Sequence, residues 1–260
     1  MSEPYDPDNL LDRRSDEGTL RVHYDQQESR ERWLLERRLG LTGGDVLSVG
    51  CGWRPSRDLF PRPQWHMTGV DMNAAAIAHL LDTGQIDAGS EGRAGELDFA
   101  PASFDVVLYR LVLHHIAFQG PLAPALHEAA RLLRPGGVLV AIEPGLWHPV
   151  GAGLALANRV GLGTPVHGTP DDIPLSPRAL QREARAAGLE PELHAVTFGW
   201  RRLPAPAQRA LHRLDPLGSR ERLARFGHTL MLIGRRSSRS GMPNPGASNG
   251  PAAKVQPSRS

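Results

Sequence analysis

Two glycines and one carboxylate are spaced as a binding site for a ribose-containing ligand requires. Gly50-Cys51-Gly52 follows the apolar run 45–49, where a strand is expected to turn into the next segment. Glycine at such a turn lets the backbone approach a ligand closely, and the N–H groups at a helix start are unpaired. Asp71 follows a second apolar run, 21 residues after Gly50, where its carboxylate can accept hydrogen bonds from both ribose hydroxyls. The alternative is a structural turn with a helix-capping aspartate.

Adjacent histidines are the candidates for acid–base chemistry. His114 and His115 follow the predicted strand 104–109, at the strand end where ligands bind in open α/β sheets. An imidazole titrates near neutral pH and can remove a proton from a substrate. A structural role at a helix start is the alternative. Proximity alone then carries the methyl transfer, or Glu143, His148 and His167 are the next candidates for a base. Cys51 has no base beside it in sequence, so we expect it to pack rather than to react.

The elements that position these residues alternate along the chain. Apolar runs predict strands at 45–49, 66–70, 104–109, 138–143, 193–198 and 229–233. Periodic or capped segments predict helices at 26–39, 73–81, 122–133 and 176–188, and 134–137 is expected to be a tight turn. The segment 86–94 is the weakest strand because it holds few apolar residues. Strands separated by helices imply a parallel sheet with crossover helices, which brings the strand ends to one edge.

Four stretches in order resemble the class I S-adenosylmethionine-dependent methyltransferases. They read VLSVGCGWRP, TGVDMN, FDVVLYRLVLHHI and LLRPGGVLVAIEPG, between residues 46 and about 145. The resemblance implies an α/β, Rossmann-like, doubly wound, seven-stranded and mostly parallel sheet with a late antiparallel hairpin. It also implies S-adenosylmethionine as cofactor and direct methyl transfer by in-line displacement.

The same resemblance implies a set of cofactor contacts and shows departures from the pattern. The implied contacts are Gly50, Cys51, Gly52, Asp71, Met72, Ala94, Gly95, Glu96, Tyr109 and Arg110. Tyr109 and Arg110 would lie near the methionine part of the cofactor, and Arg110 could hold its carboxylate. Ser48 stands where an acidic residue is common, and Arg93 stands where many relatives have the aspartate that meets the adenine amino group. Adenine recognition is then expected to rest on Ala94, Gly95 or Glu96.

The chain divides into one folded unit and two polar ends. Residues 1–18 lack hydrophobic periodicity and are interpreted as a flexible arm, and 19–234 as the methyltransferase domain. The segment 235–260 is rich in Ser, Pro and Gly and is predicted to be disordered. That tail holds five of the 30 basic residues and none of the 28 acidic ones, so the charge of +2 is poor evidence for nucleic-acid binding.

Composition and motifs narrow the classes of function. A single cysteine, no signal-peptide core and no long apolar run indicate a cytoplasmic protein without a transmembrane segment and without a metal-site spacing. Insertions at about 144–175 and 200–228 are expected to cover a small-molecule acceptor, which includes apolar compounds. Ordinary packing on the sheet edge is the alternative. Pro55, at the sixth position of the G-x-G-x-x-G pattern that begins at Gly50, disfavours a nicotinamide-dependent oxidoreductase. The remaining alternative is a non-catalytic binding module on the same fold.

Overall fold

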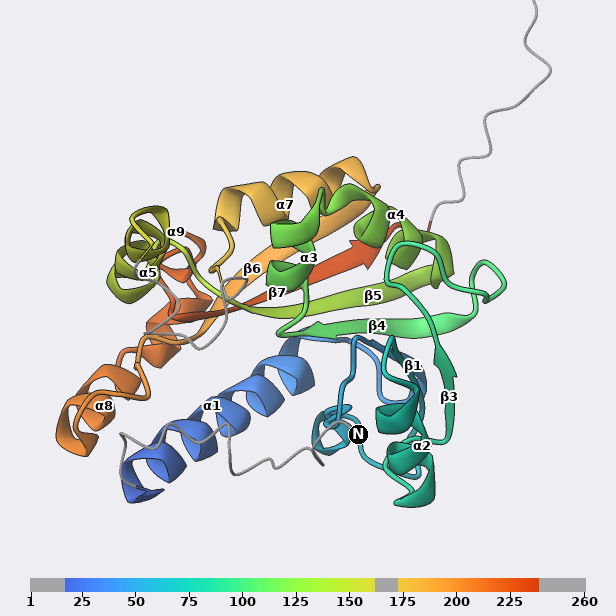
Figure 1. The fold of residues 1–260 in the computed structure, drawn as a ribbon, viewed down its shortest axis with the longest axis horizontal. Helices are drawn as coiled ribbons and strands as arrows, with labels where there is room; N and C mark the ends of the chain where they lie inside the picture. Colours follow the sequence, from blue (N-terminus) through green and yellow to red (C-terminus); the bar gives the residue numbers. More distant parts are fainter. Residues whose placement is uncertain (1–16, 162–172, 239–260) are drawn as a thin grey trace, which may run out of the picture.

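A seven-stranded sheet forms the centre of the computed structural model, which describes residues 17–161 and 173–238 (Figure 1). The strands are β1 Gly44–Val49, β2 Trp65–Asp71, β3 Ala88–Glu91, β4 Phe104–Arg110, β5 Leu133–Pro144, β6 Leu189–Thr197 and β7 Thr229–Arg236. Their order is β3-β2-β1-β4-β5-β7-β6. The first five pair in parallel, and β7 runs antiparallel between β5 and β6. The predicted seven-stranded, mostly parallel sheet with a late antiparallel hairpin is confirmed.

Helices cover both faces of this sheet. They are α1 Glu17–Arg38, α2 Ala74–Asp82, α3 Leu113–Gln119, α4 Ala123–Leu132, α5 Pro149–Arg159, α7 Pro177–Ala186, α8 Ala205–His212 and α9 Glu221–Ala224, with short 3-10 turns at Arg57–Leu59 (η2) and Asp215–Ser219 (η3). Figure 1 shows α3, α4 and α7 on one side of the sheet and α1 and α2 on the other. Two apolar cores correspond to these two faces. Among the described residues, no helix is both long and apolar enough to cross a membrane.

Several predicted boundaries were wrong. Helix α1 begins at Glu17, nine residues before the expected start and inside the predicted arm, of which residues 1–16 lie outside the described chain. Strand β7 continues through Arg236, so the tail does not begin at residue 235. The guanidinium of Arg235 donates to the carbonyls of Arg38 and Leu39, which fixes the end of the strand against α1. Residues 239–260 and most of the first insertion loop, 162–172, also lie outside the described chain.

The expected turn at 134–137 is instead part of β5. Pairing between β4 and β5 shifts register between Phe104 and Val106, whose partners are Leu133 and Val138. The extra residues at Arg134–Gly137 therefore have no partners on β4, and they interrupt the pairing of the strand as a β-bulge does. Weak apolar content in 86–94 had indicated only a weak strand, and β3 is indeed four residues long and at the sheet edge.

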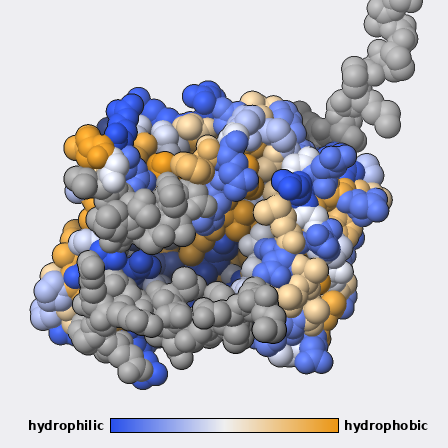
Figure 2. Space-filling view, in the orientation of Figure 1, coloured by the Kyte–Doolittle hydropathy of each residue, from blue (hydrophilic) through white to orange (hydrophobic). Residues whose placement is uncertain are grey.

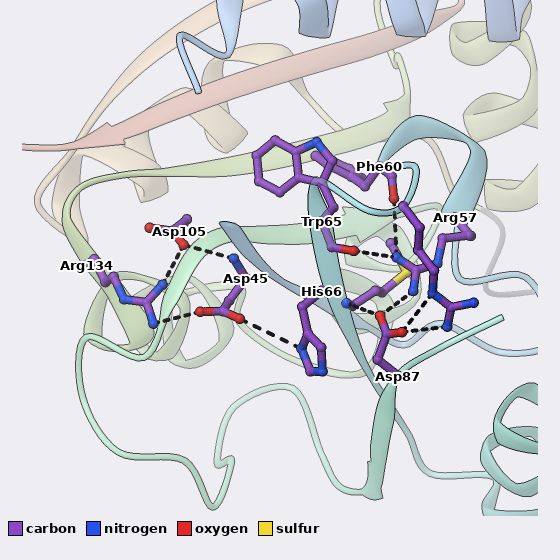
Figure 3. A network of polar contacts seen from close by, with 10 residues as sticks. Asp45, Arg57, Phe60, Trp65, His66, Asp87, Asp105 and Arg134 are labelled. Carbon is purple, nitrogen blue, oxygen red and sulfur yellow. Dashed lines mark hydrogen bonds and ion pairs between the residues drawn. The ribbon is translucent and has the colours of Figure 1, made fainter. Parts of the chain in front are cut away.

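Ion pairs and hydrogen bonds tie the starts of neighbouring strands together (Figure 3). Arg134 bridges the carboxylates of Asp45 and Asp105 at 2.8 and 2.5 Å. Asp87, just before β3, accepts from the backbone N–H of Met67 at 2.7 Å and from Arg57. Partial burial raises the pKa of Asp87, but these hydrogen bonds outweigh burial and lower it to about 2. The network holds neighbouring strands in register.

Candidate functional site

The turn after β1 requires glycine at its first position. Gly50 has φ of 63°, and an added Cβ would lie 2.6 Å from a methyl carbon of Val112. The turn therefore packs tightly against the chain that follows β4. Gly52 also has a positive φ of 49°, but an added Cβ there would meet nothing within 4 Å. Of these two positions, only that of Gly50 requires glycine both for its positive φ and for the contact that a Cβ would make.

Asp71 lies at the end of β2 and holds the glycine turn in place. Its carboxylate accepts hydrogen bonds from the backbone N–H of Gly52 at 2.7 Å and of Asn73 at 2.8 Å. The N-cap of α2 is Asn73, whose side chain accepts from Ala75 and Ala76. Each carboxylate oxygen can accept more than one hydrogen bond, so Asp71 can bind a ligand hydroxyl while keeping both backbone contacts.

A cavity of about 910 Å³ lies where these residues meet, at the carboxyl ends of β1, β2 and β4. Seven of the predicted site residues line it: Gly50, Asp71, Met72, Ala94, Gly95, Glu96 and His115. The opposite wall is apolar and comes from α3 and α4, with Val112, Ile116, Pro124 and Ala125. Arg93 also lines the cavity, at the position where the resemblance would place an aspartate. The space-filling view shows a hollow in the middle of one face, lined in part by hydrophilic side chains (Figure 2).

Tyr109 and Arg110 lie elsewhere than expected. Tyr109 is fully buried, and its hydroxyl donates to the carbonyl of Ala125 at 3.1 Å. The guanidinium of Arg110 pairs with the fully buried carboxylate of Glu31, with Nε 3.2 Å from Oε2. Neither residue is among those that line the 910 Å³ cavity. We therefore leave both out of the proposed cofactor contacts, because Tyr109 is a core residue and Arg110 already has a carboxylate partner.

Cys51 and Gly52 contribute to the turn rather than to the cavity wall. The Cys51 side chain is buried, and its Sγ lies 3.1 Å from where a Cβ on Gly69 would be. Burial raises the pKa of this thiol to about 12, helped by the charge of Asp71. A thiol with this pKa is a poor nucleophile at neutral pH. The packing role expected for Cys51 agrees with this environment.

His114 forms a dyad with Glu143 that the sequence motifs did not reveal as a pair. The carboxylate of Glu143 lies 2.6 Å from His114 Nδ1, and both side chains are almost completely buried. The Glu143 carboxylate also accepts hydrogen bonds from the backbone N–H groups of Val112 and Leu113, and a longer one from that of His114. Glu143 ends β5, the strand next to β4, so it caps the start of α3 from outside that helix. The signal available in sequence was that His114 follows β4 and that Glu143 lies near the end of the neighbouring strand β5.

A second, smaller cavity of about 200 Å³ shares two wall residues with the first, Leu111 and His115. Its described lining comes from α1, α3, α5 and the segments flanking α8 and β7, and includes Tyr24, His114, Trp200 and Arg201. Both predicted insertions therefore contribute walls, as does Tyr24 on the first helix. Leu111, between the cavities, has a positive φ of 60°, a conformation that is uncommon for leucine and occurs at strained sites.

Comparisons with known proteins agree with this site and fold. A family model described as a methyltransferase domain matches residues 47–141. The ubiquinone biosynthesis O-methyltransferase of Sodalis glossinidius is 34% identical over 110 residues, which cover 40% of this chain and 43% of that protein. The chain thus spans less than half of that relative's length. Residues 47–141 are therefore similar to the methyltransferase domain family, which agrees with the resemblance to the class I S-adenosylmethionine-dependent methyltransferases.

Solved structures with the same fold have different acceptors in their descriptions. A Thermotoga maritima protein described as a possible histamine N-methyltransferase has a TM-score of 0.58 and 18% identity, covering 84% of this chain and 92% of that one. The geranyl diphosphate C-methyltransferase of Streptomyces coelicolor A3(2) has a TM-score of 0.57 and 19% identity, covering 90% of each chain. At these identities the likeness shows the fold alone.

Proposed function

We propose that this protein transfers the methyl group of S-adenosylmethionine to a small-molecule acceptor, with the cofactor in the 910 Å³ cavity and the acceptor in the adjoining one. The observation that carries the proposal is the position of Gly50 and Asp71 on a cavity that shares Leu111 and His115 with a second cavity. Open α/β sheets bind ligands at this edge, outside the carboxyl ends of the strands.

The residues around the first cavity fit the cofactor. The close backbone approach at Gly50 and the carboxylate of Asp71 suit a ribose, and the apolar wall of Val112 and Ile116 suits a flat base. Beside this apolar wall, Ala94, Gly95 and Glu96 offer backbone groups and the Glu96 carboxylate, as expected for adenine recognition. When bound, S-adenosylmethionine supplies a sulfonium-activated methyl group, so the protein has mainly to orient the acceptor and exclude water.

We further propose that His114 is the base for an acceptor that must lose a proton, such as a hydroxyl. His114 lines the acceptor cavity, and Glu143 lies 2.6 Å from its Nδ1. A carboxylate at Nδ1 fixes the tautomer and stabilises the imidazolium that forms when Nε2 takes a proton. His115 lines both cavities and is proposed to position the two ligands. The name of the Sodalis relative, an O-methyltransferase, supports transfer to oxygen.

The alternative is a binding module without catalysis, which the departures at Ser48 and Arg93 had suggested. Ser48 has a structural role, because its buried hydroxyl donates to the carbonyl of Pro55 at 3.1 Å. Arg93 lines the cofactor cavity and remains the one feature that favours the alternative. A cytoplasmic location stays a prediction from the cysteine content.

Transfer of a labelled methyl group tests the proposed activity. The protein is incubated with methyl-labelled S-adenosylmethionine and a small-molecule extract of the cells that produce it, and labelled products are separated. We expect His114→Gln to lower transfer by about 10²–10⁴-fold while leaving cofactor affinity intact. His127→Gln, on the exposed face of α4, is the matched control and should transfer at the wild-type rate. Unchanged transfer by His114→Gln would remove the base, and cofactor binding without any labelled product would favour the non-catalytic module.

A further inference from the structure

The described wall of the 200 Å³ cavity holds cationic and aromatic side chains beside apolar ones, and no carboxylate. Arg201 and Arg202 line one part of it, and the imidazoles of His23, His114, His115 and His228 line others. Tyr24, Gln27 and Trp200 supply further hydrogen-bond donors. A ligand in this cavity therefore meets hydrogen-bond donors on several sides, and positive charge from Arg201 and Arg202.

The carboxylates behind this wall are already compensated. Glu143 receives its hydrogen bonds from backbone N–H groups and from His114. Glu31 is fully buried and is bonded by Arg110 and by Gln27, whose Nε2 lies 2.8 Å from Oε1. Neither acid is left to neutralise a cation at the cavity surface.

Among the described residues, Arg201 has no carboxylate as an ion-pair partner. Within the described residues no carboxylate lies within 4 Å of its guanidinium, and its hydrogen bond to the hydroxyl of Tyr24 is long, at 3.4 Å. The side chain is half-buried, so its charge is only partly screened by water. Its positive charge is also one cause, after burial and His212, of the lowering of the pKa of neighbouring His23 to about 4.

We propose that the acceptor carries an anionic group, a carboxylate or a phosphate, which Arg201 binds in the 200 Å³ cavity with Tyr24 beside it. A guanidinium presents a planar fork of donors that matches the oxygens of either group. Binding the anion at Arg201 places the rest of the acceptor toward His114 and His115, on the side shared with the cofactor cavity. This inference rests on the proposed function, since it takes the smaller cavity to be the acceptor site.

Matched small probes test the charge preference directly. Phenylacetate, phenyl phosphate and neutral phenylacetamide are titrated by calorimetry into the full-length protein saturated with S-adenosylhomocysteine. We expect at least one anion to bind about tenfold or more tightly than phenylacetamide, a difference of roughly 1.4 kcal/mol. The comparison of the two anions distinguishes a carboxylate from a phosphate.

Substitutions of single arginines test which residue causes the preference for an anionic probe. Arg201→Gln should abolish it and Arg201→Lys should keep part of it, whereas Arg209→Gln, an exposed arginine on α8, should behave as wild type. Thermal unfolding of each variant shows that it is folded. Equal affinity for the three probes, no binding of either anion, or a preference that survives Arg201→Gln would overturn the inference. S-adenosylhomocysteine is itself titrated into the protein before the probes. If it does not bind, the proposed function is overturned instead.

Discussion

Gly50 is the residue whose replacement tests the turn after β1 most directly. Gly50→Ala forces an alanine into a positive φ and sets its Cβ against Val112, so we expect the free energy of unfolding to fall by at least about 1–3 kcal/mol. Gly52→Ala is the matched control, because its φ is also positive but its Cβ would meet nothing. Urea unfolding measures both. Equal losses in the two variants would show that the contact with Val112 carries no weight.

The positions of Gly50 and Asp71 followed from the sequence, while their role as cofactor contacts stays a prediction. Gly50 and Asp71 end adjacent parallel strands, so their meeting follows from the strand pattern alone. Tyr109 and Arg110 were misplaced because alternation along β4 decides which side chain faces the core, and Glu31 on a distant helix decides the partner of Arg110. Arg201 was not singled out, since nothing in its neighbouring sequence shows that it lines the same cavity as His114.

Helix α3 depends on a residue from another element. Its first N–H groups bond to Glu143 at the end of β5, and the N-cap residue Val112 offers no side-chain cap of its own. Glu143→Gln keeps the size of the side chain but removes the charged acceptor, so we expect a loss of about 1.5–3 kcal/mol in the free energy of unfolding. Glu190→Gln, on the exposed side of β6, is the control. Chemical unfolding of both variants checks this, and a wild-type value for Glu143→Gln would contradict the capping role.

Elements with a strong apolar pattern were predicted, and elements stabilised by distant contacts were not. The strands β1, β2, β4 and β7 are nearly continuous buried runs, and the Ser176 cap marks the start of α7. Helix α3 was missed because its cap comes from β5. The first turns of α1 were missed because charged residues there hide the apolar face.

Buried imidazoles make the whole molecule sensitive to mild acid. Burial is the main cause that lowers the pKa of His23, to about 4, and also lowers those of His148 and His194. The unfolded chain, with an ordinary imidazole pKa near 6.5, then binds more protons than the folded chain between about pH 4 and 6.5. The contribution of His23 is therefore fully present above pH 6.5 and is lost as the pH falls toward 4.

Measuring the free energy of unfolding between pH 6.5 and pH 4 checks the sign of this pH dependence. The free energy of unfolding should fall from pH 6.5 to pH 4, and His23 should contribute up to about 1.4 kcal/mol per pH unit to this slope. His23→Gln should flatten the slope, and His127→Gln, which is exposed, should leave it unchanged. A slope that His23→Gln does not alter would show that His23 takes up a proton equally in the folded and unfolded chains.

Calorimetric titration of S-adenosylmethionine into the wild-type protein and Asp71 variants tests the central claim most directly. We predict one site per chain, and a loss of about 1–3 kcal/mol in binding free energy for Asp71→Ala, because a half-buried, charged hydrogen-bond partner is removed. Asp71→Asn, which keeps one oxygen for the backbone N–H of Gly52, should lose less, and exposed Asp82→Ala should bind as wild type. Absence of binding to the wild-type protein, or undiminished binding by a folded Asp71→Ala variant, would contradict the proposed cofactor site.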